Sequence, residues 1–145
     1  MSIPVIARNF PVSPERLLPQ STADSEPFWR GLKEGKLLAQ RCAQCRRQRW
    51  PVAPVCPFCG ATEFAWDSLP ARGEVFSFIR YRRSFLPEFE DLMPYSVVTA
   101  QLGPDVRMYG RVIDEKTPLR IGAKLEVILE SWPDDWLVPA FRLTE

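Results

Sequence analysis

The sequence predicts a mainly β protein, built from a short N-terminal helix, a small cysteine-bearing module and a five-stranded barrel. Two Cys-x2-Cys pairs are separated by ten residues, and five short β-rich runs follow Gly73. Fifteen prolines in 145 residues disfavour long helices. The chain is 46% hydrophobic and 26% charged, as globular proteins are. At such a length, folding removes roughly 68–70% of the unfolded chain's surface, which suffices for a core without disulfides.

Residues 1–24 are predicted to form an extended N-terminal arm. Five prolines occur within the first 27 residues, and their fixed backbone prevents a long regular element there. Ser13-Pro14-Glu15 has the chemistry of a single helical turn, which Pro19 would end. The arm is therefore expected to contain one short turn and otherwise extended chain.

A short helix is predicted over residues 25–36. Ser25-Glu26-Pro27 is a typical helix start, and Gly35 supplies the left-handed residue that ends the helix. Phe28, Trp29 and Leu32 fall on one face at helical spacing. That face either packs on the rest of the chain or presents its aromatic pair to a partner subunit, since rigid aromatic side chains supply much contact area.

Residues 37–70 are predicted to form a rubredoxin-like zinc ribbon. The segment 42–60 reads CAQCRRQRWPVAPVCPFCG, and each Cys-x2-Cys forms a tight knuckle that directs two thiolates at one ion. The predicted ligands are Cys42, Cys45, Cys56 and Cys59. Four thiolates complete a tetrahedral site and leave no open position for water or substrate. We therefore expect a structural zinc ion.

Two alternatives use the same cysteines: iron in a four-sulfur site, as in rubredoxin, and a pair of redox-active dithiols. The ligand type and the spacing favour zinc. Zinc binding to such peptides contributes about 10–16 kcal/mol. Because the ribbon has few apolar residues of its own, we expect it to unfold without its ion.

Residues 71–145 are predicted to form an OB-fold barrel. Residues with high β-propensity gather in short runs, several containing two-residue apolar blocks that are typical of bent barrel strands. The five runs are residues 74–81, 95–102, 107–113, 124–131 and 137–143. Five strands without a regular helix fit a small closed barrel of the OB-fold or SH3-like type. The long gap after the first run favours the OB-fold.

The composition excludes several classes of function. The sequence contains no histidine, which excludes Ser-His-Asp and Cys-His catalysis and every His-ligated metal site. We expect no catalytic residue in this chain. The net charge of +1 is divided into +1 for residues 1–40, +4 for residues 41–60 and −4 for residues 61–145. No apolar stretch approaches the ~20 residues of a membrane helix, and no secretory signal is visible, so we predict a cytoplasmic location without membrane contact.

The order of these elements resembles one known family. GKLLAQRCAQCRRQRWPVAPVCPFCG follows the Phe-Trp helix, and the barrel begins at RGEVFSF and contains PYSVVTAQLG and RIGAKLEV. Over about residues 24–143 the chain is similar to the zinc-ribbon plus OB-fold family of acyl-CoA-associated proteins, long labelled a domain of unknown function. Its most specific parts are the two knuckles, Gly73, Pro94-Tyr95 and Ile121-Gly122. Arg46 departs from the pattern, because many zinc ribbons have a glycine there.

The resemblance implies a function in assembly. Members of the family typically act as the small subunit of a complex with a thiolase-like enzyme, in acyl-CoA thiolysis, retro-aldol cleavage or acyl transfer. The partner carries the catalytic residues. The resemblance therefore implies a hetero-oligomer with a thiolase-like large subunit, in which this chain acts as a scaffold and is a candidate for binding acyl-CoA.

Four arginines beside Trp50 form a predicted basic patch: Arg41, Arg46, Arg47 and Arg49. Three roles compete for the patch. The patch is either a solvated face, or a surface that forms salt bridges with an acidic partner, or a contact for the phosphates of coenzyme A, whose oxygens match the guanidinium fork.

A zinc-ribbon/OB-fold nucleic-acid-binding protein is the alternative function. OB-folds bind oligonucleotides with the loops after the first and fourth strands, here SFLPEFEDLM and SWPDDW. Their acidic residues are Glu88, Glu90, Asp91, Asp134 and Asp135. These carboxylates are expected to be solvated and to repel a phosphate backbone, so we predict no nucleic-acid partner.

The same loops contain five large apolar side chains: Phe85, Leu86, Phe89, Trp132 and Trp136. Such residues either cap the core or, where exposed, mark a protein interface.

Overall fold

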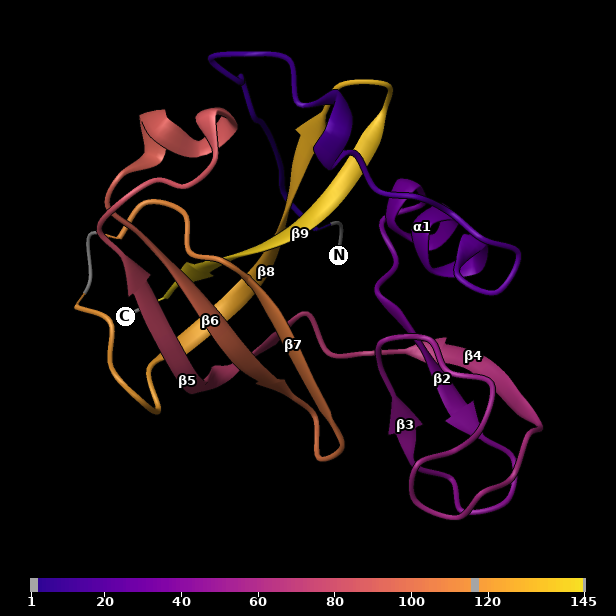
Figure 1. Ribbon diagram of the computed structural model, residues 1–145. Coiled ribbons are helices and arrows are strands. Elements are labelled where there is room, and N and C mark those ends of the chain that lie inside the picture. Colours follow the sequence, from indigo (N-terminus) through magenta and orange to yellow (C-terminus); the bar gives the residue numbers. More distant parts are fainter. Residues whose placement is uncertain (1–2, 116–117, 145) are drawn as a thin grey trace.

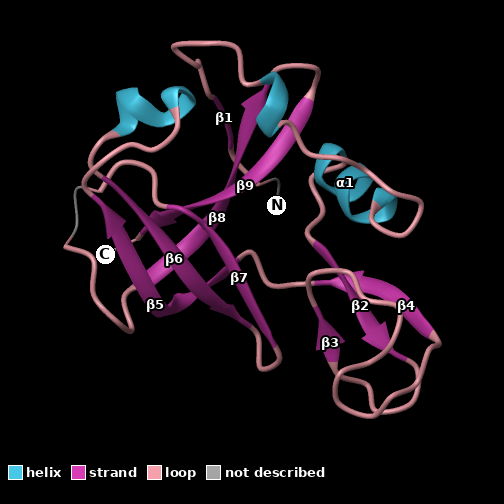
Figure 2. Cartoon of the chain, viewed as in Figure 1, coloured by secondary structure: helices cyan, strands magenta, loops and turns pink. Residues whose placement is uncertain are grey.

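The computed structural model describes residues 3–115 and 118–144, and the chain forms one three-stranded and one six-stranded β-sheet (Figure 1). Its helical elements are short: η1 (Glu15–Leu17), α1 (Glu26–Lys33) and η2 (Pro87–Leu92). Strands dominate the remainder (Figure 2). The prediction of a mainly β fold is confirmed. Within the described ranges, no helix is long and apolar enough to cross a membrane.

The smaller sheet forms the ribbon. Its strands are β2 (Leu38–Cys42), β3 (Gln48–Arg49) and β4 (Phe64–Ser68), and β2 pairs in antiparallel fashion with both neighbours. The buried amide of Gln40 accepts from the Ala53 N–H at 2.8 Å and donates to the Ala53 carbonyl at 3.1 Å. These two bonds fix the segment between the knuckles against the central strand.

The larger sheet contains the five strands that the sequence predicts. They are β5 (Arg72–Tyr81), β6 (Tyr95–Leu102), β7 (Val106–Arg111), β8 (Lys124–Trp132) and β9 (Trp136–Leu143). Strand β5 pairs with β6 over residues 74–81 and with β8 only over residues 72–74, and the outer pairs are β6–β7 and β8–β9. This strand order and the long β5–β6 connection fit the OB-fold.

The prediction of a closed barrel needs correction. Within the described residues, a parallel bridge between Val112 and Phe141 joins the β7 end to β9, in place of a continuous strand ladder. The Ile113 N–H also donates to the Phe141 carbonyl at 2.8 Å. A bulge between Val75 and Ser77 bends β5. The sheet therefore curls around its core, but β7 and β9, which would close it, are not paired by a continuous ladder of hydrogen bonds.

The chain before α1 packs on the barrel. Strand β1 (Val5–Ala7) pairs in parallel with β8, with Val5 opposite Leu129. The single turn expected after Ser13 is present as η1. The N-terminal segment thus adds a sixth strand to the larger sheet, a tertiary pairing that its prolines and short apolar run do not predict.

Helix α1 lies between the ribbon and the barrel (Figure 1). Phe28 and Leu32 are buried, and Trp29 meets Trp136 of β9 edge to face at 5.4 Å between ring centroids. Gly35 ends the helix with a φ of 76°. The Ser25 hydroxyl does not cap the helix but accepts from the Thr22 N–H at 3.0 Å. The aromatic pair of the helix therefore packs on its own chain.

Apolar side chains from every strand of the barrel form the core. The largest fully buried ones include Leu102, Met108, Leu125 and Phe141. Gly73 allows the backbone of β5 to approach β6 closely, because a Cβ atom at this position would lie 2.0 Å from the Gln101 carbonyl oxygen. Close backbone approach thus explains the glycine at the start of β5.

Candidate metal centre and surrounding surfaces

Four thiols converge at the end of the ribbon where β2 ends. The sulfur atoms of Cys42, Cys45, Cys56 and Cys59 all lie within 4.8 Å of one another. Two of the Sγ–Sγ distances, Cys42–Cys59 and Cys45–Cys56, are 3.6 Å. A zinc ion with Zn–S bonds of about 2.3 Å separates its sulfur ligands by about 3.8 Å. The four cysteines therefore fit a tetrahedral zinc ion, as predicted.

The two knuckles have the same backbone design. The Arg46 N–H donates a hydrogen bond to the Cys42 carbonyl at 3.1 Å, and the Gly60 N–H donates to the Cys56 carbonyl at 2.9 Å. In each knuckle, the residue after the second cysteine has a left-handed backbone conformation, with φ 69° at Arg46 and 82° at Gly60. Arg46 thus adopts the conformation for which many zinc ribbons use glycine, at a cost of roughly 1–2 kcal/mol.

Backbone N–H groups favour the thiolate form of the first ligand. A hydrogen bond from the Cys45 N–H is the main reason why the pKa of the Cys42 thiol falls to about 6. The Gln44 N–H also lies 3.4 Å from the Cys42 sulfur. Metal binding requires thiolates, so these two N–H groups favour the metal-binding form of Cys42. Four protein ligands fill the site, which gives the ion a structural role.

The four arginines of the predicted patch have different surroundings. Arg41 donates to Asp67 at 2.6 Å and to the Arg46 carbonyl at 2.6 Å. Arg49 is only 4% exposed, donates through Nε to the Ala53 carbonyl, and lies over the Phe64 ring, with no hydrogen-bond partner among the described residues for its two terminal nitrogens. Arg46 and Arg47 are exposed. The fold therefore leaves two of the four guanidinium groups on an open surface.

The acidic loops are less solvated than the sequence predicts. Glu88 is buried and receives two hydrogen bonds from Arg16, at 2.6 and 2.9 Å, which lower the pKa of its carboxyl to about 2. Arg8 donates to both carboxylate oxygens of Asp91, at 2.8 and 3.0 Å, and lowers its pKa. The expectation of solvated carboxylates is wrong for Glu88, which is buried beneath Arg16 of the arm, whereas Asp91 is exposed but paired with Arg8.

Most of the large apolar loop residues contact other parts of the chain. Phe10 of the arm contacts Trp132 edge to face at 4.9 Å and approaches Phe89 at 6.3 Å. Trp136 is held by Trp29. In contrast, Phe85 is 76% exposed. Phe89, Trp132 and Trp136 are therefore half-buried under the arm and α1, with Phe85 as an exposed exception.

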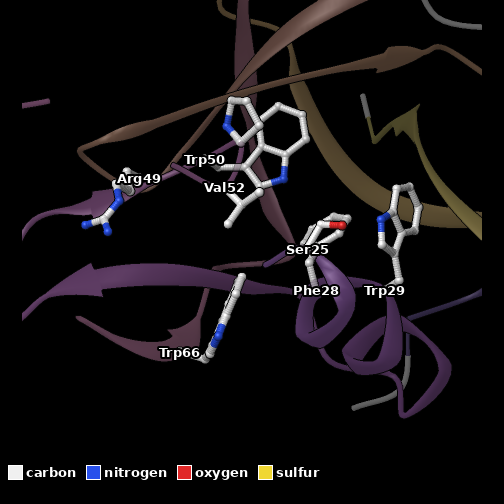
Figure 3. Close-up of a pocket in the computed structure, with 8 residues that line it drawn as sticks. Ser25, Phe28, Trp29, Arg49, Trp50, Val52 and Trp66 are labelled. Atoms are coloured by element: carbon white, nitrogen blue, oxygen red, sulfur yellow. The ribbon is translucent and has the colours of Figure 1, made fainter. Parts of the chain in front are cut away.

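A small apolar pocket lies between α1 and the ribbon, with a volume of about 100 Å³ (Figure 3). Its aromatic walls are Phe28, Trp29, Trp50 and Trp66. Sequence reasoning missed Trp66, which β4 brings to this pocket. Its position two residues after Phe64 is a period-2 signal for a half-buried strand.

Comparisons with known proteins match both modules of the chain. Residues 29–65 match the family description "ChsH2, rubredoxin-like zinc ribbon domain". Residues 66–130 match "ChsH2, C-terminal OB-fold domain". The two matches are adjacent and together include the four cysteines and most of the barrel.

Individual relatives agree with these matches. A "Probable enoyl-CoA hydratase alpha subunit" of Thermomonospora curvata is 33% identical over 140 residues, and this chain spans 41% of that protein's length. A chain of the solved "Ltp2-ChsH2(DUF35) aldolase" is similar with a TM-score of 0.76 and 26% identity, covering 88% of this chain and 100% of that one. A DUF35-family protein of unknown function from Sulfolobus solfataricus shares the fold, with a TM-score of 0.62, 16% identity, and coverage of 85% of this chain and 87% of that one.

Proposed function

This chain belongs to the family defined by the ChsH2 zinc ribbon and C-terminal OB-fold domains, and on that premise we propose that it is an accessory subunit of a thiolase-like acyl-CoA enzyme complex. In this proposal the large subunit carries out thiolysis, retro-aldol cleavage or acyl transfer. This chain scaffolds the large subunit and assists acyl-CoA binding. A cytoplasmic location remains part of the proposal.

The observation that carries the proposal is the similarity to the ChsH2(DUF35) aldolase chain. It extends over the whole of that chain, and the name of that protein contains two components, Ltp2 and ChsH2. The relative from Thermomonospora curvata is likewise named as a subunit of an enzyme that acts on a coenzyme A thioester. Both names support a shared assembly more than an enzyme that acts alone.

The metal centre supports a scaffolding role. A four-thiolate site offers no coordination position for substrate, so its contribution is to hold the ribbon in shape. The folded ribbon then presents a fixed surface next to the barrel. In this proposal, the chain contributes surface and stability to the complex, and the reacting atoms lie in the large subunit.

A contact with coenzyme A is the finer part of the proposal. Of the four arginines predicted to bind its phosphates, Arg46 and Arg47 are exposed, whereas Arg41 is paired with Asp67 and Arg49 is buried. We therefore restrict the proposed phosphate contact to the exposed pair. Arg46→Glu should raise the KM for acyl-CoA in the assembled complex and leave the zinc content unchanged.

Co-expression with the nearest encoded thiolase-like protein tests the proposed function. We expect both proteins to co-elute in size-exclusion chromatography, and the pair to cleave acyl-CoA faster than the large subunit alone. The proposal fails if the proteins elute separately and the large subunit is fully active by itself.

Nucleic-acid binding is the second candidate. One structural observation weakens the argument against it that the acidic loops give in the sequence. Arg8 and Arg16 neutralise two of the five loop carboxylates, so the OB-fold loops repel phosphate less than predicted. Oligonucleotide binding to the purified chain, measured at two salt concentrations, tests it. Salt-sensitive binding that coenzyme A does not compete away would rank this function first.

A further inference from the structure

Residues of the ribbon and of the barrel line an open groove of about 580 Å³. The turn between β6 and β7, which supplies part of its lining, approaches β3 (Figure 1). The Asp105 carboxylate in this turn accepts from the Gln48 N–H of β3 at 3.2 Å, which fixes the two modules relative to each other. Arg47 and Phe58 line the groove on the ribbon side, and Arg107 lines it on the barrel side. The groove is therefore a built feature of the interface between the modules.

Each of the two arginines lies over an aromatic ring. The Arg107 Cζ atom is 3.6 Å from the Phe76 ring centroid, and the Arg47 Cζ atom is 4.8 Å from that of Phe58. Arg107 also donates through Nε to the Gln101 side chain at 3.1 Å. Within residues 3–115 and 118–144, neither guanidinium has an ion-pair partner. Their terminal N–H groups remain available to an anion in a preorganised orientation.

Exposed aromatic side chains continue this surface across the sheet. Trp50 lines the groove and meets Tyr109 of β7 at 5.6 Å between ring centroids. Tyr109 is 58% exposed, Phe58 46% and Phe76 45%. We refer to Arg47, Trp50, Phe58, Phe76, Arg107 and Tyr109 together as the Arg47–Arg107 face. Aromatic residues with arginine, and without lysine, are the composition of the centre of protein interfaces.

We propose that the Arg47–Arg107 face is the docking surface for the large subunit, and that it receives a segment with apolar side chains and at least one carboxylate. This inference rests on the proposed function and adds the surface and the chemistry of the partner. The apolar side chains of the partner cover the rings of Phe58, Phe76 and Tyr109. Its carboxylate binds the free guanidinium edges of Arg47 and Arg107. Arg47 is thereby withdrawn from the proposed coenzyme A contact, and Arg46 alone is left to make it.

Charge complementarity favours a protein partner over a nucleic-acid strand. The groove contains only two unpaired cations, and Asp105 lies between the modules beside them. A phosphate backbone presents a row of charges and requires several cations along its path. A single Asp or Glu in an apolar segment needs only the two arginines that are present.

The decisive experiment compares two double charge reversals in the co-expressed complex. Arg47→Glu with Arg107→Glu changes the face, whereas Arg82→Glu with Arg120→Glu makes the same charge change at two exposed arginines elsewhere on the barrel. We expect the first pair to raise the Kd for the large subunit about tenfold or more, and the control pair to change it by less than about twofold. Zinc content and the melting temperature should match the wild type in both variants.

Photo-cross-linking supplies a second measurement of the same surface. p-Benzoylphenylalanine in place of Tyr109 should cross-link to the large subunit, at a peptide that contains Asp or Glu. The same label in place of Val12, which is 48% exposed on the arm, is the control and should not cross-link.

The outcomes separate this inference from the proposed function. If the wild type assembles and the Arg47/Arg107 variant assembles equally well, the docking surface is wrong while the complex stands. If the wild type does not assemble, both proposals fail. Intact assembly with a raised acyl-CoA KM, or with lost oligonucleotide binding, would overturn the inference by assigning the face to phosphate.

Discussion

The ribbon and the barrel achieve stability by different means. In the barrel, Val75, Met108, Leu125 and Phe141 are at most 1% exposed and pack against one another in a common core. Outside its metal site the ribbon adds only three apolar side chains to that core, those of Leu37, Ala39 and Leu69. It buries as many polar or charged ones: Gln40, Gln48 and Arg49. Apolar burial stabilises the barrel at about 25 cal/mol per Å². The ribbon therefore depends on its metal ion for stability that the barrel obtains from its apolar core.

Removal of the metal should produce the largest difference between the two regions. Chelation, or Cys56→Ser, forfeits zinc binding that contributes about 10–16 kcal/mol in comparable peptides. In two-dimensional amide NMR spectra we expect ribbon resonances to collapse and barrel resonances to remain dispersed. Simultaneous loss of both sets would break the comparison, because it would make the two regions one cooperative unit.

Gly73→Ala should damage the barrel and spare the metal site. Its Cβ atom would lie 2.0 Å from the Gln101 carbonyl oxygen, so the backbone of β5 or β6 must move. We expect a loss of about 3 kcal/mol in the free energy of unfolding, measured by denaturant titration. Ser77→Ala, at an exposed position on the same strand, is the control. Equal effects of the two substitutions would contradict the close-approach explanation.

Acid should weaken the attachment of the arm to the barrel. Because Arg16 lowers the folded-state pKa of Glu88 from 4.5 to about 2, the pair contributes stability that is present above pH 4.5. That contribution is lost as the pH falls towards 2. In Arg16→Ala the melting temperature should therefore drop at neutral pH and approach that of the wild type near pH 2. Arg30→Ala removes an exposed pair with Glu26 and should show little of this pH dependence.

The smallest effect should come from the ribbon turn without a glycine. Arg46→Gly relieves a left-handed backbone but adds unfolded-state freedom, so we expect a gain of about 0.5 kcal/mol. Gly60→Ala places a Cβ atom at φ 82° in the equivalent turn and should lose about 1 kcal/mol. Chelator competition measures both as changes in zinc affinity. A loss at Arg46→Gly would show that its side chain supports the knuckle.

Local pattern was enough to predict much of the fold. The spacing of Cys42, Cys45, Cys56 and Cys59 identifies a metal site, because each knuckle is a local turn that the sequence encodes directly. The five β-rich runs became β5–β9 in the expected order. Phe28 and Leu32 face the core at helical spacing, as predicted.

Pairings between distant segments were not visible in the sequence. The burial of Glu88 depends on Arg16, which is 72 residues away, and charge alone made the carboxylate look solvated. Arg49 and Arg47 are two residues apart, yet one is 4% exposed and the other is exposed on an aromatic ring. A run of basic residues in the sequence shows which charges are present, but it does not show which face of the ribbon carries each of them.

The sequence by itself determined the mainly β class, the zinc ligands and the order of ribbon and barrel, because those depend on local turns and on short-range periodicity. Tertiary structure alone decided that the arm adds a strand, that the barrel seam is a bridge, and that Arg47 and Arg107 meet across one groove. The physical reason is that burial and charge pairing arise from contacts between residues far apart in the chain. No local pattern encodes those contacts.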